Sequence, residues 1–168
     1  MRASHQEAPA SVQRVGETIQ LAMLDGRDVV YLAKEETTAP IRLASSPGMR
    51  FPAHATALGK ALLSQFERLQ LEELYRDAEL TALTPNTVRS FDHLWEQLQQ
   101  VKARGTACEQ QEAVEGFCCV AAPVFNHGNR MIAAVSFTML AASWHDKQQA
   151  ATEEIADLAR RRFLSGRM

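Results

Sequence analysis

Few cysteines and no long apolar run are found in this sequence of 168 residues. The three cysteines, Cys108, Cys118 and Cys119, are odd in number and two of them are adjacent. This pattern argues against a disulfide framework and favours a reducing cytoplasm. No stretch is long and apolar enough to cross a bilayer, and the first residues lack the apolar segment of a signal peptide. We therefore expect a cytoplasmic protein with no membrane partner.

An excess of charge of either sign is also missing. The chain has 18 basic and 20 acidic residues, so its net charge of −2 gives no electrostatic footprint for DNA or RNA. Hydrophobic residues make up 46% and charged residues 23%, as in an ordinary globular domain. The length favours one domain with a substantial core.

Complete nucleotide-binding motifs are absent as well. The stretch RFPAHATALGKALLS, residues 50–64, contains Gly59-Lys60. A Walker A loop would need glycine where His54 stands and Ser or Thr where Ala61 stands, so the motif fails at both ends. The stretch instead predicts a helix over 54–65, whose first N–H groups and dipole favour an anion such as a carboxylate.

The cysteines and histidines of the chain give weak evidence for a metal site or for a catalytic thiol. Cys108, Cys118, Cys119 and His127 are close in sequence but form no C-x-x-C pair, and adjacent residues on a strand point to opposite faces. We expect no metal site and no cofactor. A small thiol-dependent enzyme that uses Cys119 with His54 as its base stays open as an alternative.

Hydrophobic periodicity predicts the order helix, three strands, three helices, three strands, helix. The expected elements are helix 9–16, strands 18–24, 29–35 and 41–45, helices 54–65, 67–78 and 91–103, strands 106–112, 116–125 and 130–140, and helix 144–164, with a loop at 46–52. Turn signals at Asp25-Gly26 and at 126–129 predict hairpins, so the fold class is α+β with a largely antiparallel sheet of about six strands flanked by helices. Ser90 is the expected N-cap of helix 91–103, and Pro123 requires a strand edge or a bulge.

Two hydroxyls follow strand spacing near the end of the chain. Ser136 and Thr138 lie two residues apart, so they face the same side of a largely apolar strand. If they are buried, they need hydrogen-bond partners. They could bond a ligand, or they could bond the backbone or water or face solvent.

Three motifs in register resemble the effector-binding domain of IclR-family bacterial transcription regulators. PAHATALGKALLS (52–64) is similar to the family's Pro-x-His-Ala/Ser-x-x-x-Gly-Lys run. RGTACEQQEAVEGFCCVAAPVF (104–125) is similar to its stretch from Arg-Gly to Ala-x-Pro-x-Phe, and MIAAVSFTML (131–140) to its Ala-Ala-x-Ser-x-Ser segment. The resemblance covers residues 9–163.

This resemblance implies a GAF-like, non-enzymatic sensor domain over residues 9–168, after a flexible tail at 1–8. Full-length members of the family carry a winged helix-turn-helix domain before the sensor, and that domain is absent from this chain. We therefore expect DNA binding only through the absent domain, and self-association as a dimer or tetramer. A GAF-type sensor of cyclic nucleotides is a third interpretation, which would need a larger pocket.

The resemblance further implies a pocket for a small acid between the start of helix 54–65 and the central strands. The matching positions are Ala57 and Leu58 as backbone donors, Glu109 as an acidic position, Cys119 as the family cysteine, and Ser136 and Thr138 as paired hydroxyls. An ionised Glu109 would repel an anion unless it accepts a hydrogen bond from a ligand hydroxyl. We therefore expect a hydroxy- or oxo-acid, sugar-derived acids included, rather than a plain fatty acid.

Overall fold

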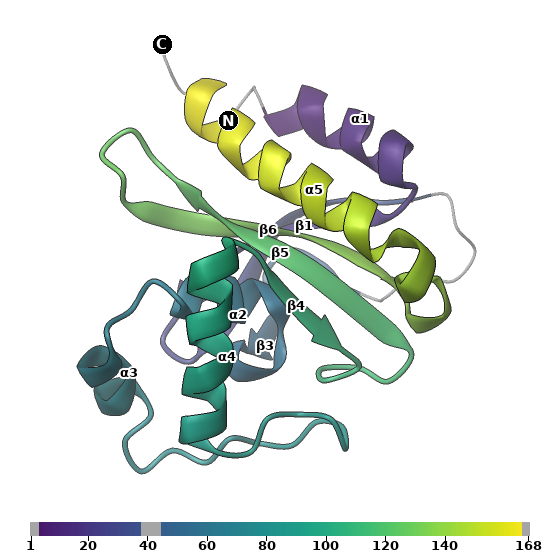
Figure 1. Cartoon of the computed structure of the whole chain (residues 1–168). Helices are drawn as coiled ribbons and strands as arrows, with labels where there is room; N and C mark the ends of the chain where they lie inside the picture. Colours follow the sequence, from purple (N-terminus) through teal and green to yellow (C-terminus); the bar gives the residue numbers. More distant parts are fainter. Residues whose placement is uncertain (1–3, 38–44, 166–168) are drawn as a thin grey trace.

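One six-stranded sheet organises the chain, with its strands in the order β3-β2-β1-β6-β5-β4 (Figure 1). The computed structural model describes residues 4–37 and 45–165. Its strands are β1 (Thr18–Asp25), β2 (Asp28–Glu35), β3 (Arg50–Pro52), β4 (Ala107–Gln110), β5 (Phe117–Phe125) and β6 (Met131–Leu140). Every pairing between these strands is antiparallel. The expected α+β class with an antiparallel sheet is confirmed.

Helices cover both faces of this sheet, as Figure 1 shows. The helices are α1 (Ser4–Val15), α2 (Ala57–Leu63), α3 (Arg68–Leu74), α4 (Phe91–Arg104) and α5 (Ala141–Ser165), with a 3-10 turn η1 (Ala53–Ala55) before α2. Neighbouring strand residues point to opposite sides, so each face has its own core. Ala121 and Ala134 pack toward α2 and α4, whereas Val120 and Val135 pack under α5. None of the helices in the described part of the chain has the length and hydropathy of a membrane span.

Local signals set the bounds of α4 and of the first hairpin. The Ser90 hydroxyl accepts the N–H of His93, and Gly105 ends α4 with a left-handed φ of 80°. β1 and β2 pair across Asp25-Gly26, as predicted. Pro123 also fits its prediction, because β4 pairs with β5 only as far as Ala121 and leaves the proline on an unpaired edge.

The third strand differs from the prediction. Residues 41–44 lie outside the described residues, and Ser45 has no strand structure. The strand that pairs with β2 is instead Arg50–Pro52, within the stretch that was predicted to be a loop. Three residues with a proline carry too little periodicity to indicate a strand, so only the contact with β2 defines it.

The helix predicted over 54–65 begins later than expected. Residues Ala53–Ala55 form η1, Thr56 is extended at φ −114° and ψ 149°, and α2 begins at Ala57. The packing of η1 on α2 requires Gly59, because a Cβ at this position would lie 2.0 Å from the carbonyl oxygen of Ala53. The glycine lets η1 and α2 pack directly against each other. The helix predicted over 67–78 is also shorter, since α3 ends at Leu74 and Asp77 has a φ of 56°.

Candidate ligand-binding site

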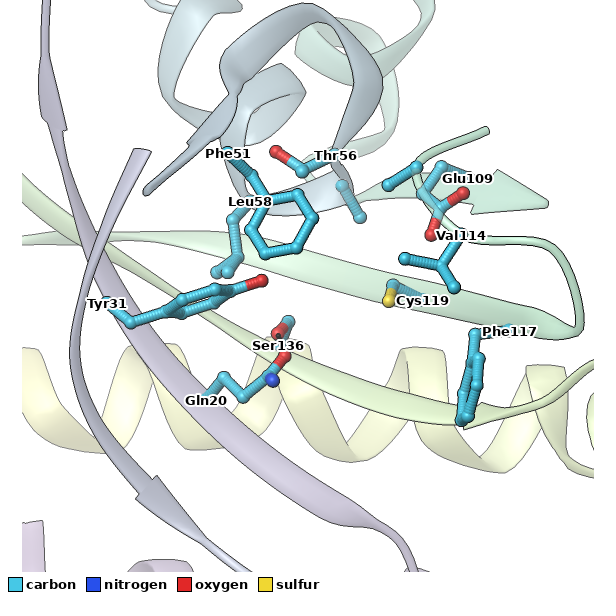
Figure 2. A pocket seen from close by; sticks show the side chains of 12 residues that line it. Gln20, Tyr31, Phe51, Thr56, Leu58, Glu109, Val114, Phe117, Cys119 and Ser136 are labelled. Carbon is cyan, nitrogen blue, oxygen red and sulfur yellow. Dashed lines mark hydrogen bonds between the residues drawn. The ribbon is translucent and has the colours of Figure 1, made fainter. Parts of the chain in front are cut away.

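A cavity lies between the start of α2 and the face of the sheet that is opposite α5 (Figure 2). It has about 370 Å³ of space free of protein atoms, part of it open to solvent. The lining residues are Gln20, Tyr31, Phe51, Thr56, Ala57, Leu58, Glu109, Ala113, Val114, Phe117, Cys119 and Ser136. Of the residues expected at the ligand, the structure brings all but Thr138 to this cavity.

The start of α2 supplies backbone donors to one wall. The Thr56 hydroxyl accepts the N–H of Gly59 at 2.9 Å, and the N–H of Lys60 bonds the Thr56 carbonyl at 3.0 Å. The N–H groups of Ala57 and Leu58 belong to the first turn of α2, so they have no acceptor within that helix. Because α2 begins at Ala57 and not at residue 54, the backbone N–H donors at the start of the helix are those of Ala57 and Leu58.

The opposite wall is a polar network across three strands. Thr138 Oγ1 donates to Gln20 Oε1 at 2.7 Å, and Cys119 Sγ lies 3.2 Å from the same Thr138 oxygen. Thr138 thus bonds protein groups behind the cavity wall. Ser136 Oγ is fully buried, lines the cavity, and has only a long contact of 3.5 Å to Gln20 Oε1. Its hydroxyl therefore has hydrogen-bonding capacity to spare.

Glu109 is a buried carboxyl group in this wall. It pairs with Cys119 across β4 and β5, it is 3% exposed, and its Oε2 accepts the N–H of Glu112 at 2.8 Å. Burial raises its pKa from 4.5 to about 7. Near neutral pH the carboxyl group is therefore present in both forms, and the protonated form can donate a hydrogen bond to an anion.

Aromatic rings close the remaining side. Tyr31 and Phe51 pack edge to face with their centroids 5.9 Å apart, and the Tyr31 hydroxyl points into the cavity (Figure 2). Burial, followed by the nearby Cys119 and Glu109, raises the Tyr31 pKa, so the phenol keeps its proton and can donate. Phe117 lies at the far end of the cavity in the same view.

Sequence reasoning missed several of these residues, and strand alternation was only a partial signal for them. Gln20 and Tyr31 occupy inward positions of strands in which Ala22 and Val29 are buried. A polar group on the inward face of a strand needs a partner or a ligand, but alternation sets Gln20 on the face opposite that of the apolar Ile19, Leu21 and Met23. Only a sheet covered on both faces makes the Gln20 position inward, so the pattern identifies this residue only once the helices on both faces are known. Phe51 belongs to β3, which was itself missed.

The thiol-enzyme alternative is not supported by the geometry. His54 does not line the cavity that Cys119 lines, and its Nε2 lies 2.9 Å from the Thr81 carbonyl oxygen. Burial and then the charge of Glu109 raise the pKa of the Cys119 thiol well above its ordinary value. A nucleophilic cysteine needs the opposite shift. Within residues 4–37 and 45–165, no cluster of His, Cys, Asp or Glu could hold a metal ion.

Comparison with known proteins agrees with this architecture. Residues 10–162 match the family described as bacterial transcriptional regulator IclR C-terminal. The chain belongs to this IclR family. It is 38% identical over 138 residues to the HTH-type transcriptional regulator XynR of Escherichia coli (strain K12), which covers 82% of the chain and 55% of XynR. It is 35% identical over 122 residues to KdgR of Dickeya chrysanthemi, with 73% and 40% covered. The IclR-family chain thus spans about half the length of these curated relatives.

Solved structures from the IclR family share its fold. The C-terminal domain of E. coli KdgR superposes with a TM-score of 0.84 at 27% identity, over 95% of this chain and 93% of that one. The inducer-binding domain of PobR from Acinetobacter, a double mutant solved with 3-hydroxybenzoic acid, gives 0.80 at 25% identity over 95% and 96%.

Proposed function

We propose that this IclR-family domain senses a small organic acid, which it binds in the cavity between α2 and the sheet. The observation that carries the proposal is a partly enclosed, partly aromatic cavity that contains buried polar groups with spare hydrogen-bonding capacity. The N–H groups of Ala57 and Leu58 suit a carboxylate, and the Ser136 hydroxyl can bond a second oxygen of the ligand.

The chemical class of the ligand follows from Glu109 and from the size of the cavity. A protonated Glu109 can donate to a carboxylate or to an oxo oxygen of the ligand, and an ionised one can accept from a ligand hydroxyl. A hydroxy acid therefore suits both forms of Glu109, and an oxo acid suits the protonated form. Part of the cavity's space is open to solvent, so the enclosed part is narrow and favours a compact molecule. PobR was solved with 3-hydroxybenzoic acid, a hydroxy acid, which supports this class for the present chain.

In the whole regulator, binding would change the affinity for DNA of an N-terminal helix-turn-helix domain. A ligand can do so only if it binds the DNA-competent and DNA-incompetent states unequally. We also infer that the regulator works in the cytoplasm. We further infer that it self-associates as a dimer or tetramer, because helix-turn-helix proteins commonly bind two DNA half-sites as symmetric dimers.

A cavity-filling variant tests the proposal. Ala113 is half-buried in the loop that lines the cavity, so Ala113→Trp should place an indole in the ligand's space. The control is Ala142→Trp, at an exposed position of α5 away from the cavity. We expect isothermal titration with a panel of small hydroxy- and oxo-acids to show saturable binding by the wild type. The Ala113→Trp variant should bind at least about tenfold more weakly, a loss of about 1.4 kcal/mol, and the control should be unchanged. Tight binding by alkanoates alone, or binding that Ala113→Trp leaves intact, would contradict the proposal.

A further inference from the structure

Gln20 and Ser136 lie directly opposite each other where β1 pairs with β6, and both side chains line the cavity. Figure 2 shows the amide and the hydroxyl together on the sheet side of the cavity. Gln20 is 2% exposed and Ser136 is fully buried. Two uncharged polar side chains with so little access to water must be satisfied by the protein or by a ligand.

The amide of Gln20 is held in one orientation by its neighbours. Its Nε2 donates to Ser45 Oγ at 2.7 Å, and its Oε1 accepts from Thr138 Oγ1 at 2.7 Å. The thiol of Cys119, 3.2 Å from Thr138 Oγ1, can donate to that oxygen because the hydroxyl hydrogen is directed to Gln20. The Gln20 amide thus bonds the protein through both its nitrogen and its oxygen. These bonds hold the side chain in place before any ligand binds, which lowers the entropy cost of binding.

Gln20 Oε1 and the Ser136 hydroxyl each keep hydrogen-bonding capacity that the protein does not fully use. A carbonyl oxygen has two lone pairs, and Gln20 Oε1 uses the second only for the contact of 3.5 Å with Ser136 Oγ. At that distance a hydrogen bond is weak, so the Ser136 hydrogen can turn toward the cavity at little cost. The cavity wall thus presents an acceptor, Gln20 Oε1, beside a donor, Ser136 Oγ–H.

We propose that Gln20 and Ser136 together select a ligand hydroxyl group, which donates to Gln20 Oε1 and accepts from Ser136 Oγ–H. This inference rests on the proposed function and sharpens it, because it separates hydroxy acids from oxo acids. An oxo group can accept from Ser136 but has no hydrogen for Gln20 Oε1, and an unsubstituted acid satisfies neither. Thr138 is a positioning residue, which acts on the ligand only by holding the Gln20 amide.

The test compares matched acids on matched variants. Each small acid is titrated calorimetrically as its hydroxy, oxo and unsubstituted form, for example lactate, pyruvate and propionate, together with 3-hydroxybenzoate and benzoate. Gln20→Met keeps the side-chain length and removes the amide, and Gln149→Met makes the same change at an exposed position of α5. Wild type and Gln149→Met should prefer the hydroxy form over the unsubstituted form by about tenfold or more, and over the oxo form by a smaller factor. Gln20→Met should reduce both preferences to about twofold or less.

Different failures have different meanings. If wild type binds none of these acids, the proposed function and the inference are both wrong. If acids bind and Gln20→Met keeps the preference for the hydroxy form, the inference alone is wrong. Circular dichroism checks the fold, and should Gln20→Met not fold, Ser136→Ala removes the donor half of the pair and must lower the same preference. An oxo form that binds more tightly than its hydroxy partner would also overturn the inference.

Discussion

Lys60 Nζ lies 2.6 Å from Glu112 Oε1, and the two side chains are only 2% and 11% exposed. The pair lies beside the ligand cavity, because the N–H of Glu112 bonds the Glu109 carboxylate that lines it. The Glu112 carbonyl also accepts from the Thr87 hydroxyl at 2.5 Å. Lys60, the lysine of the apparent phosphate motif, thus holds the loop after β4 in place and binds a protein carboxylate.

Removal of the Lys60 charge should destabilise the fold. Lys60→Met leaves Glu112 buried without its partner, and we expect the free energy of unfolding in urea to fall by about 3 kcal/mol or more. The double variant Lys60→Met/Glu112→Met removes both charges and should recover much of that loss. Arg76→Met, which breaks an exposed pair with Glu73, should cost less than about 1 kcal/mol. A double variant no more stable than Lys60→Met would contradict this account.

Gly59 should not tolerate a side chain. In an open helix, Gly→Ala adds about 1 kcal/mol of stability, so propensity alone predicts that Gly59→Ala stabilises the protein. The close approach to Ala53 predicts the opposite sign, because a Cβ would lie 2.0 Å from the Ala53 carbonyl oxygen. We expect a loss of at least about 2 kcal/mol in thermal or urea unfolding. At Gly128 a Cβ would lie 3.4 Å from the Asn126 side chain, so Gly128→Ala is the control and should change stability little. A stabilised Gly59→Ala variant would show that η1 and α2 can separate.

Local chemistry made α4 and the hairpins predictable. The Ser90 cap, the Gly105 end and the Asp25-Gly26 turn each depend on residues close in sequence, and the structure confirms all three. β3 could not be predicted in this way, because Phe51 becomes part of a strand only through its partner Val29. The arrangement of η1 and α2 likewise depends on the backbone contact between Gly59 and Ala53, and the spacing of hydrophobic residues does not indicate that contact.

The candidate site shows the same division. Ala57, Glu109 and Cys119 lie within motifs and were named from the sequence, and the structure brings them to one cavity. Gln20 reaches that cavity because β1 pairs with β6 in a register that sets it opposite Ser136. That register joins segments far apart in the chain, so a single sequence could name neither the inward position of Gln20 nor its partner.

Cysteine reactivity separates a sensor from a thiol enzyme. Cys108 is exposed and Cys119 is partly buried. Burial raises the pKa of both thiols, and for Cys119 burial and Glu109 raise it well above the ordinary value. We expect iodoacetamide at mildly alkaline pH to modify Cys108 at least about tenfold faster than Cys119, as measured by peptide mass spectrometry. Cys108→Ser should remove the fast phase. Rapid alkylation of Cys119 at neutral pH would restore the enzyme interpretation.

Glu109 should make stability fall as the pH rises. Its pKa is about 7 in the folded protein and close to its ordinary value of 4.5 in the unfolded chain, so between these values the folded state binds the extra proton. Stability therefore decreases from pH 4.5 to about pH 7, by on the order of 3 kcal/mol, and this contribution is constant outside that window.

Urea unfolding of wild type and Glu109→Gln at a series of pH values isolates the effect, since the contributions of other titratable groups cancel in the difference. The variant keeps an oxygen for the Glu112 N–H and should become the more stable protein as the pH passes 7. Glu73→Gln, at an exposed ion pair, serves as the control and should keep the slope of the wild type. An equal slope in Glu109→Gln would mean that folding leaves the pKa of Glu109 unchanged, so that the buried carboxyl group is ionised at neutral pH. An anionic ligand could then bind beside it only by donating a hydrogen bond to it.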